Sequence, residues 1–299
     1  MDYDPIKDRF GDIVAANSWL ARPFFFLLHI IFLRSWYVRR ELKRQIEAAR
    51  NSRARMTTQP DGGANRRGDH VVMLDAGTGF GQFSDFVARR YKDVEIDAVD
   101  IKEEYLDRAE SMFIKNDLAD RVHFAVEDLT ALQKKGPYDL ILSVDVMEHI
   151  LEDEAVFRNF YRVLRPGGVV IINTPSDQGG SDVNAGSDES FIGEHVRDGY
   201  NAEEIASKLR RAGLEPSHIL FTYGKWGSLA WRFLIKWPMQ ILNVSWLFVL
   251  LLPFYHLVVF IPGMALHAMD MRRPNKSGTG LLVVAEKKRN FDSDSEAVL

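Results

Sequence analysis

Residues 71–81 of the chain read VVMLDAGTGFG, and this stretch decides the fold. Its first half is a short apolar run with the length of one buried strand, and its second half is a glycine-rich turn. Residues 82–90 follow, with Phe83, Phe86 and Val87 on one face of a helix. A strand, a glycine turn and a helix open a nucleotide-binding βαβ unit, because glycines permit backbone angles and a close ligand approach that a Cβ would block.

A second acid supports this interpretation and separates two kinds of ligand. The next predicted strand, residues 94–99, ends at Asp100, about 20 residues after the turn, where a carboxylate can accept hydrogen bonds from both ribose hydroxyls. The turn has glycine at alternate positions, unlike the G-x-G-x-x-G fingerprint of dinucleotide-binding proteins. Asp75, two residues before the first glycine, would repel a pyrophosphate. The same carboxylate suits a ligand that carries an ammonium and a sulfonium.

The rest of the core alternates strands and helices with short connections. Further apolar strands are predicted at 122–126, 138–144, 169–174 and 219–223, and residues 280–285 are predicted as a last strand, antiparallel and paired with the sixth. The predicted fold class is therefore α/β, a seven-stranded, mostly parallel, doubly wound Rossmann-like sheet with an antiparallel last strand. An apolar helical segment at the N-terminus and an apolar helical insertion before the last strand complete it.

The motifs resemble those of a known family. Asp75-x-Gly77-x-Gly79-x-Gly81 resembles the first motif of the class I S-adenosylmethionine-dependent methyltransferases, and residues 164–168, LRPGG, resemble the turn that precedes their fifth strand. The resemblance covers about residues 70–224 and resumes near 280. It implies S-adenosyl-L-methionine as the cofactor, in the branch that methylates oxygen or carbon of small molecules or lipids. It places the cofactor-binding residues at Asp75, Gly77, Thr78, Gly79, Gly81, Asp100, Ile101, Asp128, Leu129, Ser143 and Asp145.

Methyl transfer requires little acid–base catalysis from the protein, except where the acceptor is a hydroxyl, which needs a base. His149, after the fourth strand, and His195, in the long loop after the fifth, are the catalytic candidates. Otherwise His149 caps or packs its helix and His195 orders its loop. No metal site is predicted, although some ubiquinone-type O-methyltransferases resemble the stretch 145–149 and use acids there for a metal.

Composition limits the possible settings. The chain has 299 residues, a formal charge of −4 and no cysteine, which excludes disulfides, thiolate zinc sites and a cysteine nucleophile. The N-terminus lacks the positive start and cleavage site of a signal peptide, so we expect a cytoplasmic protein with peripheral or monotopic association with the inner face of the membrane. No N/D-P-P-Y sequence follows the fourth strand, which disfavours nucleobase acceptors, and no nucleic-acid partner is expected.

Two segments are candidates for membrane contact. Residues 19–33 are mostly apolar, and the stretch 34–55 that follows holds eight Lys or Arg against two acids, which suits a helix in the membrane interface or a lid on the domain. Residues 239–269 contain no charged side chain. If both ends of this run leave one edge of the sheet, a single crossing is excluded, and a hairpin dipping into one leaflet is favoured over an apolar lid or a dimer interface.

These observations give the following division of the chain. An N-terminal membrane-interface or lid segment occupies 1–47, a flexible linker 48–69, the methyltransferase domain 70–226 and 277–288, the membrane-associated insertion 227–276, and a disordered tail 289–299.

The predicted function is methyl transfer to a small, lipophilic acceptor, such as a quinone precursor, polyene, isoprenoid or lipid, at the membrane surface. A non-catalytic S-adenosylmethionine-binding scaffold at the membrane, or an enzyme acting on a soluble small molecule, are the alternatives. The sequence leaves the acceptor atom and the oligomeric state open.

Overall fold

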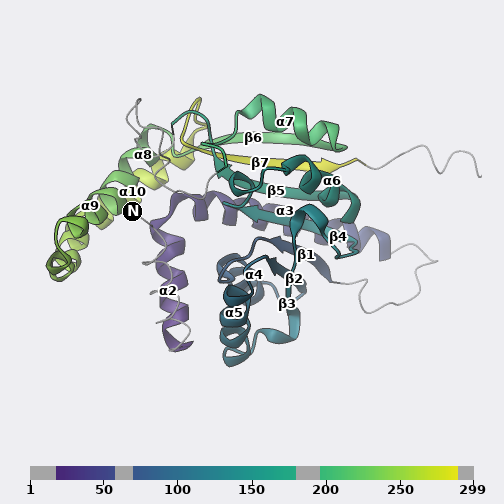
Figure 1. Ribbon diagram of the computed structural model, residues 1–299, viewed down its shortest axis with the longest axis horizontal. Coiled ribbons are helices and arrows are strands. Elements are labelled where there is room, and N and C mark those ends of the chain that lie inside the picture. Colours follow the sequence, from purple (N-terminus) through teal and green to yellow (C-terminus); the bar gives the residue numbers. More distant parts are fainter. Residues whose placement is uncertain (1–17, 58–69, 180–195, 289–299) are drawn as a thin grey trace, which may run out of the picture.

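The computed structural model describes residues 18–57, 70–179 and 196–288, and its centre is one seven-stranded sheet in the order β3-β2-β1-β4-β5-β7-β6 (Figure 1). Strands β1 to β5 pair in parallel, and β7 runs antiparallel between β5 and β6. This arrangement confirms the predicted fold class. The strands are β1 Val71–Ala76, β2 Val94–Asp100, β3 Val122–Val126, β4 Tyr138–Val144, β5 Leu164–Pro175, β6 Leu214–Thr222 and β7 Gly280–Lys287.

Helices cover both faces of the sheet, because consecutive strand residues alternate between two apolar layers. Met73 and Leu140 pack on one face against α3, α4 and α5, whereas Leu74 and Ile141 pack on the other against α6 and α7. The helices are α3 Leu33–Thr57, α4 Gln82–Arg90, α5 Glu103–Lys115, α6 Asp153–Val163 and α7 Ala202–Arg211, with short 3-10 turns η2 Ala119–Arg121, η3 Leu129–Ala131 and η4 Met147–His149.

Helix α3 belongs to the protein core. Val38, Leu42 and Ile46 are fully buried on one side of it, against the sheet residues of the first apolar layer. Its basic residues pair with acids of the domain: the Arg53 guanidinium donates to the Asp139 carboxylate at 2.6–3.0 Å, and Arg50 forms an ion pair with Asp93. Part of the positive charge that suggested a lipid-facing helix is therefore paired with acids of the domain.

These pairs also extend the helix beyond its predicted end. Since α3 continues to Thr57, the first ten residues of the predicted linker 48–69 are helical. Arg50 and Arg53 hold this part of the helix against the domain, which the local sequence could not reveal because their acidic partners lie more than 40 residues away. The remainder of the linker, the segment 1–17, the loop 180–195 and the predicted tail from 289 lie outside the described residues.

Helix α2, Ser18–Ile31, precedes α3 and has one packed and one open side. Phe25 and His29 are buried, and His29 lies between the rings of Phe83 and Phe86 at 5.6 Å from each. Phe26 and Leu27 are 65% and 48% exposed. The helix thus covers α4 next to the glycine turn and leaves two large apolar side chains on the surface.

The apolar insertion is a helical hairpin that extends away from the sheet (Figure 1). Its first arm is α8 Lys225–Trp231, the π-helical η5 Arg232–Lys236 and α9 Trp237–Val244. Its tip is η6 Trp246–Leu251, and its second arm is α10 Leu252–Arg272. Thr222 pairs with Gly280, so the two ends of the hairpin leave the same edge of the sheet, as the predicted strand pairing required. By length and composition alone, Leu247–Arg272 could cross a bilayer.

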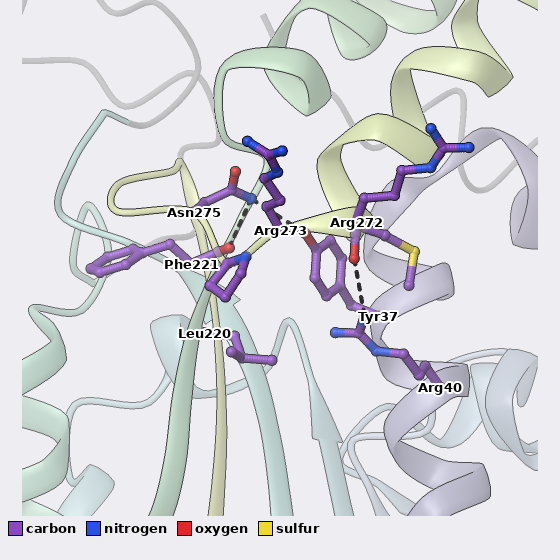
Figure 2. Close-up of a pocket in the computed structure, with 9 residues that line it drawn as sticks. Tyr37, Arg40, Leu220, Phe221, Arg272, Arg273 and Asn275 are labelled. Atoms are coloured by element: carbon purple, nitrogen blue, oxygen red, sulfur yellow. Dashed lines mark hydrogen bonds between the residues drawn. The ribbon is translucent and has the colours of Figure 1, made fainter.

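A buried carboxylate anchors the hairpin to the core. Asp270, 1% exposed, accepts hydrogen bonds from the Tyr37 hydroxyl at 2.9 Å, the Gly227 N–H at 2.9 Å and the Asn275 amide at 3.0 Å. Asn275 also donates to the Phe221 carbonyl at 3.2 Å (Figure 2). The hairpin base is therefore joined to α3 and to β6 through one charged group with several donors, the condition under which a buried charge is tolerated.

We expect Leu42→Ala to lower the free energy of unfolding by about 2–5 kcal/mol, because it removes a fully buried side chain of α3 from the core. The exposed neighbour Lys43 is the matched control, and Lys43→Ala should leave the denaturant midpoint nearly unchanged. Equal, small effects of the two substitutions would show that α3 is not part of the folding core.

Candidate functional site

The glycine turn after β1 has the backbone that its residues predict. Gly77, Gly79 and Gly81 all have positive φ angles, of 81°, 54° and 79°. A Cβ on Gly77 would lie 2.2 Å from Cγ2 of Val146, so glycine lets the turn approach the loop that follows β4. A Cβ on Gly79 would meet no atom within 4 Å, so the turn leaves open space on that side.

Asp75 and Thr78 stabilise this turn through side-chain hydrogen bonds. One carboxylate oxygen of Asp75 accepts hydrogen bonds from the Thr78 hydroxyl at 2.8 Å and the Ser84 hydroxyl at 2.6 Å. Burial raises the pKa of Asp75 to about 6, although both hydroxyls favour the charged form. One oxygen of Asp75 thus connects β1 with the turn and α4, and its predicted role beside a ligand ammonium stays a prediction.

Asp100 ends β2 beside the turn, as predicted. Its two carboxylate oxygens accept hydrogen bonds from the Gly79 N–H at 2.8 Å and the Lys102 N–H at 3.0 Å. Each oxygen keeps a second lone pair, so the group can also accept bonds from two vicinal hydroxyls. Ile101 follows directly and is 67% exposed, which leaves an apolar surface for a flat ring next to that carboxylate.

The next predicted pair lies after β3. Asp128 is exposed and caps η3 by accepting from the Thr130 N–H at 2.8 Å and the Thr130 hydroxyl at 2.7 Å. Leu129 is 6% exposed and packs in the second apolar layer. Asp128 is thus open to a ligand, whereas most of Leu129 is turned into the core.

The end of β4 brings polar side chains from several elements together. Asp145 has a positive φ of 54°, and it is held by its N–H bond to the Asn173 carbonyl at 2.8 Å and by the Asn173 amide at 3.0 Å. Arg34, at the start of α3, forms an ion pair with the Asp145 carboxylate. The Ser143 hydroxyl is fully buried and has no hydrogen-bond partner within the described ranges.

Glu148 is the buried acid of this loop and was not among the predicted site residues. It is 1% exposed, and one of its oxygens accepts a hydrogen bond from the Thr174 hydroxyl at 3.1 Å. Burial, followed by the nearby Asp145 carboxylate, raises the pKa of Glu148 to about 8. A carboxyl group whose pKa is displaced in this way next to a glycine-rich turn is typical of a functional site.

Tyr223 connects the site to the hairpin. It follows β6 directly, has a positive φ of 53°, and its hydroxyl accepts a hydrogen bond from the Arg34 backbone N–H at 3.2 Å. Burial raises the pKa of Tyr223 to about 12. Because α8 begins two residues later, the first arm of the hairpin starts at the residues that contact Arg34.

Of the two predicted histidines, the structure describes His149. His149 ends η4 with an exposed side chain, while its neighbour Glu148 turns inward. His195 lies outside the described residues, so its catalytic role stays a prediction. Within the ranges that the structure describes, no group of three or more acids or histidines is arranged to hold a metal ion.

Sequence reasoning also missed Arg34 and Tyr223. Arg34 lies 111 residues from its partner Asp145, and Tyr223 lies 189 residues from Arg34, so no local pattern could join them. The stretch 145–149 did carry a signal for Glu148, but an acid and a histidine side by side do not reveal which of them faces inward.

A cavity of about 230 Å³ lies elsewhere, at the base of the hairpin. Figure 2 shows it between Tyr37, Arg40, Arg273 and Asn275. None of the predicted cofactor residues lines it. We therefore place the candidate site at the glycine turn and not at this cavity.

The residues of the turn fit S-adenosylmethionine. The open side of Gly79 gives space for the ligand, Asp100 supplies acceptors for its ribose hydroxyls, and the exposed Ile101 can cover its adenine. Asp100 supplies the negative charge beside the turn that suits a ligand with positive charge on sulfur and nitrogen, because Asp145 is paired with Arg34 and the raised pKa of Glu148 favours its neutral form.

Comparisons with known proteins agree with this geometry. Residues 73–168 match the family model described as a methyltransferase domain. The chain is 30% identical over 178 residues to 27-O-demethylrifamycin SV methyltransferase of Amycolatopsis mediterranei, an alignment that covers 56% of this chain and 63% of that protein. It is 26% identical over 114 residues to a ubiquinone biosynthesis O-methyltransferase of Caulobacter vibrioides, covering 38% of this chain and 44% of that protein.

Solved structures with a similar fold include one methyltransferase complex. It is phosphoethanolamine N-methyltransferase 2 of Haemonchus contortus in complex with phosphomonomethylethanolamine and S-adenosylhomocysteine. It is 20% identical, with a TM-score of 0.52, and the match covers 80% of this chain and 53% of that one. Residues 73–168 therefore match a methyltransferase domain within a fold of this kind, and the chain spans less than two thirds of the length of the curated relatives that it matches.

Asp100→Ala should weaken S-adenosylmethionine binding about ten- to a hundredfold, because it removes a charged acceptor for the ribose and the partner of the Gly79 N–H. Titration calorimetry measures this change. Glu104→Ala, an exposed acid in the first turn of α5, is the matched control and should bind as the native protein does. Equal affinities for the two variants would remove Asp100 from the cofactor site.

The pKa of Glu148 predicts a pH dependence of stability. Its folded-state pKa of about 8 lies above its ordinary value of 4.5, so the folded protein binds more protons than the unfolded chain between these values. The contribution of Glu148 to stability is therefore full below about pH 4.5 and is lost as the pH rises to about 8. Denaturant melts of the native protein and of Glu148→Gln, compared at pH 5 and pH 8, should show a smaller fall for the variant; a parallel fall would contradict this assignment.

Proposed function

We propose that the protein transfers the methyl group of S-adenosylmethionine to a small lipophilic acceptor at a membrane surface. The observation that carries this proposal is the position of the hairpin. It begins at Tyr223, whose hydroxyl contacts Arg34, and the Arg34 guanidinium pairs with Asp145 at the carboxyl edge of the sheet. The hairpin that carries the exposed apolar surface thus starts at the polar residues beside the cofactor turn.

The cofactor supplies an activated methyl group, and the protein has to align the acceptor with it and exclude water. Helices α2 and α3 cover the turn for this purpose. The Gln82 amide, directly after the turn, contacts Nδ1 of His29 at 3.3 Å and donates to the Ser35 hydroxyl at 3.2 Å. Both partners are buried, so this side of the site is closed to solvent.

Near the end of β4, a polar group of the methylated substrate would meet both hydrogen-bond donors and hydrogen-bond acceptors. Arg34 and Asn173 carry donor groups for an oxygen of the substrate, and Glu148 can receive a proton from a hydroxyl in its ionised form, which its raised pKa makes the minor form at neutral pH. The relatives named above include oxygen and nitrogen methyltransferases, so the acceptor atom of this protein stays open among oxygen, nitrogen and carbon.

The surface of the hairpin supports a membrane-bound acceptor. Large apolar side chains on its tip and second arm are 55–78% exposed, which is unfavourable in water and marks an interaction surface. They are Leu247, Leu250, Leu251, Phe254, Leu257, Val258 and Ile261. Association of this surface with the inner face of the membrane would let an acceptor dissolved in the bilayer reach the site without crossing water.

Leu257→Glu tests the proposal without removing any packing, because the Leu257 side chain is 78% exposed. A carboxylate at this position should lower binding to lipid vesicles about a hundredfold, and transfer of labelled methyl to acceptors in a lipid extract should fall with it. S-adenosylmethionine affinity should be unchanged, since the cofactor turn is untouched.

Ile114→Glu is the matched control, because it adds the same charge at a 60% exposed apolar position on α5. It should bind vesicles and transfer methyl groups as the native protein does. Full transfer to the lipid extract by Leu257→Glu, with vesicle binding lost, would point to a soluble acceptor. Cofactor binding without any transfer by the native protein would point to a scaffold.

A further inference from the structure

The first arm of the hairpin contains a break in its backbone hydrogen bonding. In η5 the Trp237 N–H bonds to the Arg232 carbonyl, five residues earlier, and Pro238 has no N–H. The carbonyls of Phe233 and Leu234 therefore lose the partners that an α-helix would give them at positions 237 and 238.

The second arm supplies replacements. The Tyr255 hydroxyl donates to the Phe233 carbonyl at 2.8 Å, and Nε2 of His256 lies 3.2 Å from the Leu234 carbonyl. Nδ1 of His256 also lies 3.0 Å from the Leu252 carbonyl, so His256 donates to the Leu234 carbonyl in the tautomer that carries the proton on Nε2. In that tautomer, two neighbouring side chains of α10 donate to two neighbouring carbonyls of η5. The arms are also in close contact, because a Cβ on Gly263 would lie 2.7 Å from Cδ2 of Leu234.

These hydrogen bonds add little stability to a hairpin in water, and much to a hairpin in hydrocarbon. On an exposed hairpin in water, solvent would hydrate the two carbonyls, whereas an apolar medium offers them no partner. Close helix contact at a small residue and polar side chains bonded across the interface are also features of helix pairs in membranes. The hairpin therefore has the internal hydrogen bonding that transfer into lipid requires.

The length of the apolar part matches one leaflet. From Arg232 to Val244 the first arm is about 18 Å long. The part of the second arm with strongly exposed apolar side chains, from Leu252 to Ile261, is about 14 Å long, against about 15 Å for half of the hydrocarbon core. Arg232 is exposed at the start of this part, and Lys236 lies over the Trp231 ring at 6.0 Å. Basic and tryptophan side chains at such a boundary suit the headgroup layer.

We propose that the hairpin enters a single leaflet as a closed unit, as far as the level of Arg232 and Ile261, and that the acceptor is taken from that leaflet. The part of this inference that concerns the acceptor rests on the proposed function, whereas the depth of insertion is inferred from the contacts between the two arms of the hairpin. Tyr255 and His256 are positioning residues for this state.

Single labelled cysteines test the depth, because the chain has no cysteine of its own. Leu250→Cys at the tip, Leu257→Cys on the arm and Met269→Cys near the base are exposed positions for a fluorophore. In vesicles of phosphatidylcholine and phosphatidylglycerol, lipids that carry a quencher deep in the acyl chain should quench the first label most. Iodide outside the vesicles should quench only the third.

Two results would overturn the proposal. Quenching of the Leu250→Cys label by iodide trapped inside the vesicles would mean that the hairpin spans the bilayer. Quenching of all three labels by external iodide would mean that the hairpin stays in water. Methyl transfer to a lipid extract is measured on the same samples, so failure of the proposed function and failure of the insertion depth are told apart.

Tyr255→Phe tests the role of the cross-arm bond. It should lower vesicle partitioning about three- to twentyfold, because the Phe233 carbonyl would enter lipid unpaired. The melting temperature in vesicle-free buffer should stay within a degree or so, since water can hydrate that carbonyl. Phe254→Leu, at the exposed neighbouring position, is the control and should change neither the vesicle partitioning nor the melting temperature strongly. A lower melting temperature with unchanged partitioning would assign the bond to packing in water and contradict the proposal.

Discussion

The antiparallel pairing of β7 between β5 and β6 is the constraint on which the arrangement of the molecule depends. This pairing sets Gly280 opposite Thr222, so a chain that leaves the sheet after β6 has to return to the same edge. Fifty-odd residues inserted there can form only an out-and-back structure, and the prolines at the starts of α9 and α10 fit its arms. The same edge holds the glycine turn, because the parallel strands β1 to β5 end there.

Helix α3 joins the two halves of this edge. Arg34 reaches Asp145 beside the cofactor turn, and Tyr37, one turn further along, binds the buried Asp270 at the foot of the hairpin. A single rigid element thus positions a cation in the site and fixes the orientation of the apolar arm. Since the body of α3 is packed against the sheet, neither contact depends on a flexible connection.

The parts of the fold and site that follow from neighbouring residues could be predicted from the sequence. The turn at 77–81 and the strand that ends at Asp100 are local patterns, and the structure has them where they were expected. The charge-free run and the predicted pairing of the sixth and last strands indicated a hairpin in place of one long helix. Long-range pairs could not be predicted: the basic face of α3 resembled a lipid-binding surface because Asp93 and Asp139, which accept its charge, lie far along the chain.

Titration calorimetry of the purified protein with S-adenosylmethionine and S-adenosylhomocysteine tests the central claim most directly, with a nicotinamide dinucleotide as the competing ligand. The geometry of the turn predicts that each sulfur nucleoside binds with a stoichiometry of one, and that titration with the dinucleotide gives no heat of binding. Binding of the dinucleotide, with no response to either sulfur compound, would contradict the account of the site and of the reaction built on it.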